Sequence, residues 1–268
     1  MTSRTTETTS DGEIAEQASP GSAPLVRCED LYRLHGDKGD EMAILRGVNC
    51  TIQTGEFVCI MGPSGSGKSS LLHLISGLDE PSAGRVLLAG KDLADTPAAE
   101  RTLIRRRQIG YVFQFFNLLP NLNVTENIAL PLVIEGRSRE EQAAAVPPLL
   151  ERFGIKERAH ALPHELSGGE MQRTSIARAL AGGQPLLLCD EPTGNLSQKA
   201  GQAVMESLRE ACDRDGRTVL LVTHNPRDAA FADRVHFLVD GVIDDSRILE
   251  GPDIQVEDVH AALSALHI

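Results

Sequence analysis

One glycine-rich segment carries the residue types that can surround a phosphate group. It follows an apolar run, precedes a helical pattern and fits the spacing G-x-x-x-x-G-K-[ST], which is the expected context of a phosphate-binding loop. Glycines let backbone N–H groups turn inward around phosphate oxygens, and a helix N-terminus adds partial positive charge there. Lys68 can then reach the β- and γ-phosphates, and the Ser69 hydroxyl can bind Mg²⁺. We therefore predict, over a structural Gly/Ser-rich turn, a nucleotide site formed by Gly62, Pro63, Ser64, Gly65, Ser66, Gly67, Lys68, Ser69 and Ser70.

A second candidate is a pair of carboxylates at the end of the apolar run 185–189. A buried strand would hold Asp190 rigidly near a metal ion, and Glu191 could polarise a water for in-line attack. By itself the pair is also typical of an acidic turn at a strand end. The phosphate-binding loop upstream favours the catalytic interpretation.

A third candidate is a helix start about 100 residues after the loop. Ser167 and Glu170 have capping-box spacing, and Gly168 and Gly169 allow another backbone or an anion to approach closely. The alternative is an ordinary helix cap. A single chain that binds one nucleotide at the loop has no evident use for a second helix start that suits a phosphate.

The elements that must position these residues form an α/β pattern. Several late strands are continuous apolar runs, which favours a mainly parallel sheet covered on both faces. Helices are expected over 68–77 and over 97–108, the latter with Thr96 as N-cap and Pro97 at the first helical position. Strands are expected at 25–30, 48–52, 57–61, 85–88, 109–113, 185–189, 218–222 and 235–239.

A helical segment is predicted inside this α/β pattern, over about 115–165. Its helices are expected at 124–135 and 138–146, the second with a capping box formed by Ser138 and Glu141. Pro147 and Pro148 are expected to break or kink the chain before a last turn at 149–153.

Composition limits the remaining possibilities. The chain has 268 residues and a formal net charge of −12, which disfavours a sequence-independent nucleic-acid binder, and we expect no nucleic-acid partner. The basic helix at 101–107 is better explained as a solvated face or a partner surface. No apolar run approaches the length of a membrane helix, no secretory signal is evident, and the five scattered cysteines indicate reduced thiols in a cytosolic protein.

We expect a disordered tail at 1–24, a folded domain at 25–245 and a peripheral acidic extension at 246–268.

Together the motifs resemble those of the nucleotide-binding subunits of ATP-binding cassette (ABC) transporters. Leu166-Ser167-Gly168-Gly169-Glu170, followed by Met171-Gln172-Arg173, is similar to the family signature LSGG[EQ]xQR. The resemblance covers about 25–241 and implies a P-loop NTPase fold: a RecA-like core with a mainly parallel sheet, an antiparallel β subdomain at one edge and an inserted α-helical subdomain. It implies Mg²⁺-dependent hydrolysis of ATP sandwiched between two such chains, in a homodimer or a heterodimer. It also implies a separate transmembrane permease subunit, contacted through a groove near 115–120, and a cytoplasmic location on the inner face of the membrane.

The resemblance also assigns roles to single residues. It implies Glu191, His224, Lys68 and Gln114 as catalytic residues, and Ser69, Gln114 and Asp190 as metal ligands. The ATP of the partner chain would meet Ser167, Gly168, Gly169 and Glu170. His35 stands where the family usually stacks a Tyr on adenine, and Tyr32 is the alternative.

The segments 105–107, 113–120 and 190–196 are similar to the branch for lipoprotein release, macrolide export and antimicrobial-peptide export. Ser197 stands where the family normally has an Asp that crosses the dimer interface. This departure concerns hydrolysis and coupling between the two sites rather than ATP binding. It leaves open a slow-hydrolysing ATP-gated clamp in a signalling or cell-division complex, or a heteromeric pairing with a complete partner.

Overall fold

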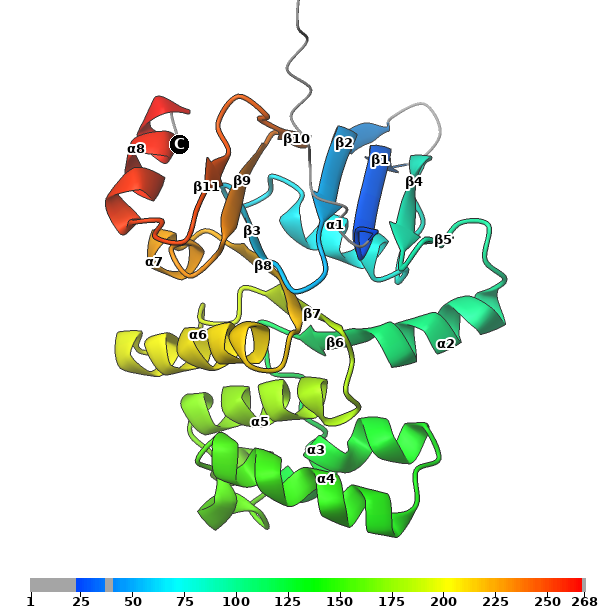
Figure 1. Ribbon diagram of the computed structural model, residues 1–268, viewed down its shortest axis with the longest axis vertical. Coiled ribbons are helices and arrows are strands. Elements are labelled where there is room, and N and C mark those ends of the chain that lie inside the picture. Colours follow the sequence, from blue (N-terminus) through cyan, green and yellow to red (C-terminus); the bar gives the residue numbers. More distant parts are fainter. Residues whose placement is uncertain (1–22, 37–40, 267–268) are drawn as a thin grey trace, which may run out of the picture.

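The computed structural model describes residues 23–36 and 41–266, which form two β-sheets and a separate helical layer (Figure 1). Most of the tail predicted at 1–24 lies outside these residues. All five cysteines are buried and free, as expected for reduced thiols. In the described part of the chain, no helix has both the length and the apolar character needed to cross a bilayer.

The larger sheet has seven strands in the order β10-β9-β3-β8-β7-β6, with β11 pairing with β9. Strands β3, β6, β7, β8 and β9 are parallel, as predicted, whereas β10 and β11 are antiparallel additions. Parallel strands present their carboxyl ends at one edge, where ligands bind in such sheets. The strands are β3 (Phe57–Met61), β6 (Ile109–Val112), β7 (Leu186–Asp190), β8 (Thr218–Thr223), β9 (Arg234–Val239), β10 (Val242–Ile243) and β11 (Leu249–Glu250).

The smaller sheet is antiparallel, in the order β2-β1-β4-β5. Its strands are β1 (Val26–His35), β2 (Met42–Ile52), β4 (Ala83–Leu88) and β5 (Lys91–Asp92). The strands predicted at 25–30 and 48–52 were too short. Register shifts between Cys28 and Leu34 interrupt the apolar alternation of β1, so the pattern stops before the strand does.

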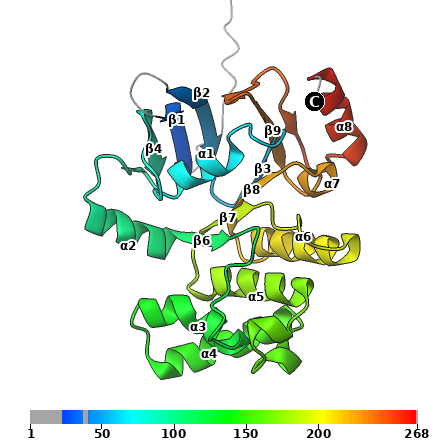
Figure 2. The same ribbon diagram turned by 180° about the vertical axis from the view of Figure 1, so that it is seen from behind.

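Helices cover the larger sheet on both faces (Figures 1 and 2). Their bounds are α1 (Lys68–Ile75), α2 (Ala98–Gln108), α5 (Gly168–Ala181), α6 (Gln198–Asp213) and α7 (Pro226–Ala229). The expected start of α2 was wrong by one residue. Pro97 is the N-cap, and the Thr96 hydroxyl donates to the carbonyl oxygen of Asp92 in the preceding turn instead of capping the helix.

The inserted helical layer contains α3 (Val124–Ile134) and α4 (Arg139–Arg152), and α3 packs against α5. Short 3₁₀ turns follow at Lys156–Arg158 and Pro163–Glu165. The capping box of Ser138 and Glu141 is confirmed. Of the predicted break or kink at Pro147-Pro148, the break is wrong, because α4 continues through both prolines. Both rings face solvent, where water can satisfy the freed carbonyl groups, while Val146 and Leu150 anchor the same helix in the core.

The acidic segment after Asp240 is not peripheral, contrary to expectation. Strand β11 joins the larger sheet, and α8 (Val256–Ala265) packs against the core through Val259 and Ala262. These apolar residues recur at helical spacing among the acidic ones, so the acidic side chains occupy the outer face.

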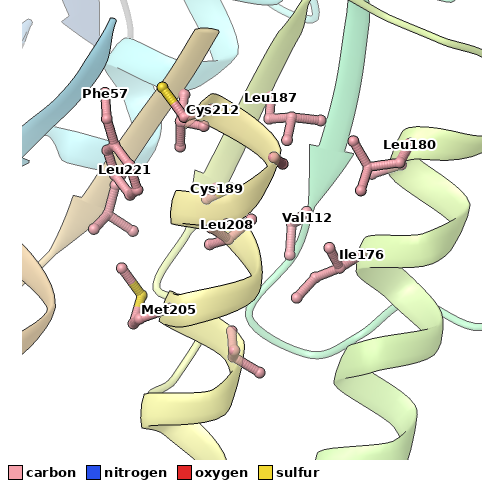
Figure 3. Close-up of a cluster of buried hydrophobic side chains, with 14 of the residues drawn as sticks. Phe57, Val112, Ile176, Leu180, Leu187, Cys189, Met205, Leu208, Cys212 and Leu221 are labelled. Carbon is pink, nitrogen blue, oxygen red and sulfur yellow. The ribbon is translucent and has the colours of Figure 1, made fainter. Parts of the chain in front are cut away.

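The main core lies between the larger sheet and helices α5 and α6. Figure 3 shows Met205, Leu208 and Cys212 of α6 pointing at the strands, and Ile176 of α5 beside Val112. Each fully buried Leu or Ile contributes about 1.5–3 kcal/mol to this packing. The core therefore holds the strand ends in fixed relative positions.

Candidate functional site

The glycine-rich loop joins β3 to α1, as predicted. Gly65 and Gly67 have φ angles of +83° and +105°, a region that favours glycine. A Cβ on Gly62 would lie 2.1 Å from the backbone oxygen of Leu238 in β9. The loop therefore needs glycine at Gly62 for close packing and at the other two positions for backbone conformation.

Lys68 bends back over this loop. Its Nζ donates to the carbonyl oxygens of Gly62 and Pro63, each at 2.9 Å, and lies 3.8 Å from Oε1 of Glu191. Burial lowers the pKa of Lys68, and attraction to the carboxylates of Glu191 and Asp190 opposes this shift. A buried ammonium held only by carbonyl dipoles and a nearby carboxylate would gain from an anionic phosphate.

Ser69 and Asp190 meet across the start of α1 and the end of β7. The Ser69 hydroxyl donates to Oδ1 of Asp190 at 3.1 Å. Burial raises the pKa of Asp190, which means that the carboxylate would be stabilised by a cation. A hydroxyl and a carboxylate are oxygen ligands that suit Mg²⁺. Among the residues that the structure describes, no three His, Cys, Asp or Glu side chains cluster as a metal site, so phosphate and water would have to complete the coordination.

Glu191 follows β7 in a left-handed conformation, with φ of +43°. Its Oε2 lies 3.0 Å from Nδ1 of His224, which follows β8. Both residues line a cavity of about 370 Å³. A non-glycine residue in this conformation is held by its surroundings and is typical of functional sites.

Gln114 lies near the same carboxylate. A Cβ on Gly194 would be 3.4 Å from Nε2 of Gln114 and 3.7 Å from Oε2 of Glu191, so both side chains approach Gly194. Asn195 also donates to the carbonyl oxygen of Gln114 at 3.1 Å. The structure therefore brings Lys68, Ser69, Gln114, Asp190, Glu191 and His224 to one edge of the sheet.

The helix start at Ser167 has the predicted capping box. The Ser167 hydroxyl and backbone N–H both donate to Oε2 of Glu170, at 2.7 and 2.8 Å, and these bonds lower the pKa of Glu170. Gly168 and Gly169 lie close to Leu196 and Ala200 rather than to the phosphate-binding loop. Helices α1 and α5 occupy different layers in both views (Figures 1 and 2).

His35 ends β1 as an exposed residue beside 37–40, which lie outside the described residues. Tyr32 lies over Gly47, since a Cβ on that glycine would be 3.1 Å from the tyrosine hydroxyl. Stacking of adenine on either side chain stays a prediction.

Two residues that support the site, Arg178 and Asp228, were not predicted from the sequence. Arg178 of α5 donates to the carbonyl oxygens of Asn117 and Phe116, at 2.6 and 2.9 Å, which ties α5 to the segment after Gln114. Asp228 is buried between the turns that follow β7 and β8. Neither lies in a recognisable motif, and no signal in one sequence would have identified them.

Comparison with known proteins gives consistent matches. A family model described as ABC transporter matches residues 45–194. The lipoprotein-releasing system ATP-binding protein LolD 2 of Caulobacter vibrioides is 43% identical over 85% of this chain and 100% of its own length. The macrolide export ATP-binding/permease protein MacB of Shigella flexneri is 40% identical to this chain. The match covers 82% of this chain and 34% of the length of MacB. A dimeric ATP-binding cassette, MJ0796, in a post-hydrolysis state with ADP and Pi, has a TM-score of 0.78 and 39% identity, covering 84% of this chain and 98% of that one.

Proposed function

Since this chain belongs to the ABC transporter family, we propose that it hydrolyses ATP and thereby powers a separate membrane subunit of the lipoprotein-release or macrolide-export type. The observation that carries the proposal is the convergence of Lys68, Ser69, Asp190, Glu191 and His224 at one sheet edge. The match to LolD 2 over its whole length supports a subunit of that kind.

In the proposed reaction, water attacks the γ-phosphate of ATP and ADP leaves. The loop N–H groups and Lys68 bind the phosphates, with Nζ exchanging its two carbonyl partners for phosphate oxygens. Glu191 orients and polarises the water, and His224 holds the carboxylate of Glu191 through their 3.0 Å contact. Bound Mg²⁺, held by Ser69, Asp190 and Gln114, would neutralise charge on the phosphates.

We propose that a second copy completes each site. Gly168 and Gly169, which follow Ser167, lie beside Leu196 and Ala200 of their own chain rather than beside its phosphate-binding loop. A capped helix N-terminus with two glycines can receive the phosphates bound to a partner. The dimeric state of the MJ0796 cassette supports this arrangement.

Mixing two inactive variants tests the proposal. Lys68→Met disables the loop and Ser167→Arg blocks the helix start, so each variant alone should have little turnover. In a mixed dimer, one site combines the intact loop of one chain with the intact helix start of the other. Recovery of roughly a quarter of the wild-type rate supports shared sites, whereas full activity of the Ser167→Arg chain alone would contradict them.

We expect Ser69→Ala to raise the Mg²⁺ concentration for half-maximal turnover by about tenfold, since one ligand or hydrogen bond contributes about 1–1.5 kcal/mol. The measurement is a Mg²⁺ titration of turnover at saturating ATP. Ser207→Ala is the control, because the Ser207 hydroxyl bonds only within α6. An unchanged Mg²⁺ dependence in Ser69→Ala would remove Ser69 from the metal site.

The membrane subunit is proposed to contact the groove near 115–120, which would place the chain on the inner face of the membrane. Phe115 is 71% exposed and Leu119 is 44% exposed, and Ile134 of α3 is 50% exposed nearby in the helical layer. A cavity of about 250 Å³ with Phe113 and Ile134 in its wall lies in the same region. Exposed apolar side chains grouped in this way favour a protein partner. Phe115→Asp is expected to reduce copurification with the membrane subunit while ATP binding is retained.

A further inference from the structure

A buried carboxylate joins the two turns that carry Glu191 and His224. Asp228 lies in α7 with 4% of its surface exposed. Its Oδ2 accepts hydrogen bonds from the Thr193 and Thr223 hydroxyls, the second at 3.4 Å, and its Oδ1 accepts one from the Asn225 amide at 3.1 Å. Buried carboxylates are retained where several donors satisfy them.

These donors are the neighbours of the candidate catalytic residues. Thr193 comes two residues after Glu191, while Thr223 and Asn225 stand immediately before and after His224. Thr193 and Asn225 also line the cavity that contains Glu191 and His224. A shift of either turn would therefore change the 3.0 Å contact between Glu191 and His224.

We propose that Asp228 is a positioning residue for ATP hydrolysis, because its carboxylate ties the turn after β7 to the turn after β8. The inference rests on the function proposed above. Asp228 acts through Glu191 and His224 and touches neither ATP nor the attacking water.

A purely local role explains the contacts less well. The N-terminus of α7 already has a cap, since Oδ1 of Asn225 accepts from the backbone N–H of Arg227 at 3.1 Å. Asp228 supports that cap only through the Asn225 amide, which donates to its Oδ1. Its hydrogen bond with Thr193 instead joins residues 35 positions apart in the sequence, and it connects the turn after β7 with the segment after β8. Burial raises the pKa of Asp228, and the hydrogen bonds donated by Thr193, Thr223 and Asn225 oppose this shift.

Thr193→Val tests the link with a side chain of the same shape that lacks the hydroxyl. We expect kcat to fall about ten- to a hundredfold, because small displacements of catalytic groups cost this much, with KM for ATP changed less than twofold. Thr193→Ser, which keeps the hydroxyl, should restore most of kcat. Asp228→Leu should lower kcat similarly, and adding Thr193→Val to it should cause little further loss.

Val259→Ala is the control, because it removes buried apolar volume in α8 without touching these hydrogen bonds. It should lower Tm at least as much as Thr193→Val and leave kcat unchanged. A second readout needs no turnover: the ¹⁵N shift of Nδ1 of His224, identified by its loss in His224→Gln, should move in Thr193→Val and not in Val259→Ala.

Two results would overturn the inference: an unchanged kcat in Thr193→Val, or an equal fall of kcat in Val259→Ala. A wild-type chain without turnover would instead overturn the proposed function. In that case, if the ¹⁵N chemical shift of His224 is the same in Thr193→Val as in the wild type, the positional link is overturned as well. A changed ¹⁵N chemical shift supports the link.

Discussion

Glu191→Gln is expected to lower ATP turnover about 10³-fold while ATP still binds. The carboxylate is the group that we propose to polarise the water, and losing general-base catalysis costs about 10²–10⁴-fold. Gln keeps the size of the side chain and can still contact Nδ1 of His224, which lies 3.0 Å from Oε2 of Glu191. The loop and Lys68 are unaltered, so the phosphates keep their binding groups. Turnover by phosphate release and affinity by calorimetry measure the two effects separately.

The matched control for this variant is Glu206→Gln, which removes an exposed carboxylate from α6. It should have wild-type turnover. If Glu191→Gln retained more than about a tenth of the wild-type rate, water would be activated elsewhere, and the role given to Glu191 would be wrong.

Lys68→Met is expected to weaken ATP binding by about a hundredfold, since hydrogen bonds to charged groups contribute about 1.5–3 kcal/mol. The stability of the free chain should change little. The side chain of Lys68 is 5% exposed, and its Nζ lies against two carbonyl oxygens and 3.8 Å from the Glu191 carboxylate, so removing its charge also removes a desolvation cost. Calorimetric titration with ATP gives the affinity, and thermal unfolding without nucleotide gives the stability.

Lys199→Met, on the exposed start of α6, is the control for this charge change. Equal losses of affinity in both variants would indicate that general charge attraction, rather than the loop lysine, holds the phosphates.

Much of the parallel sheet could be predicted from the sequence, because its strands are continuous apolar runs. The run at 57–61 coincides with β3, and the catalytic candidates follow directly from the ends of β7 and β8. The length of β1 could not be predicted, since its register shifts disrupt the alternation that identifies a strand. Helix α8 was missed because acidic residues obscure Val259 and Ala262 in a short amphipathic pattern.

The residues of the candidate site also fall into those that the sequence predicts and those that only the structure reveals. Lys68, Ser69 and Glu191 belong to compact motifs in which residue type and spacing are enough to predict their neighbours. The partner of Lys68 in the free chain, a pair of loop carbonyls, depends on backbone geometry that spacing does not give. Asp228 depends on contacts with Thr193 and Thr223 across two strands, which only the folded chain brings together.

The most direct test of the account is the steady-state ATPase rate per chain, measured over a wide range of protein concentration with Glu191→Gln as the blank. If two copies share ATP, the rate per chain should rise with concentration to a plateau and disappear in the variant. This concentration dependence would also show that Ser197 is tolerated at the interface between the two copies. A rate equal to the blank at every concentration, with ATP still bound, would contradict a self-sufficient pair of chains.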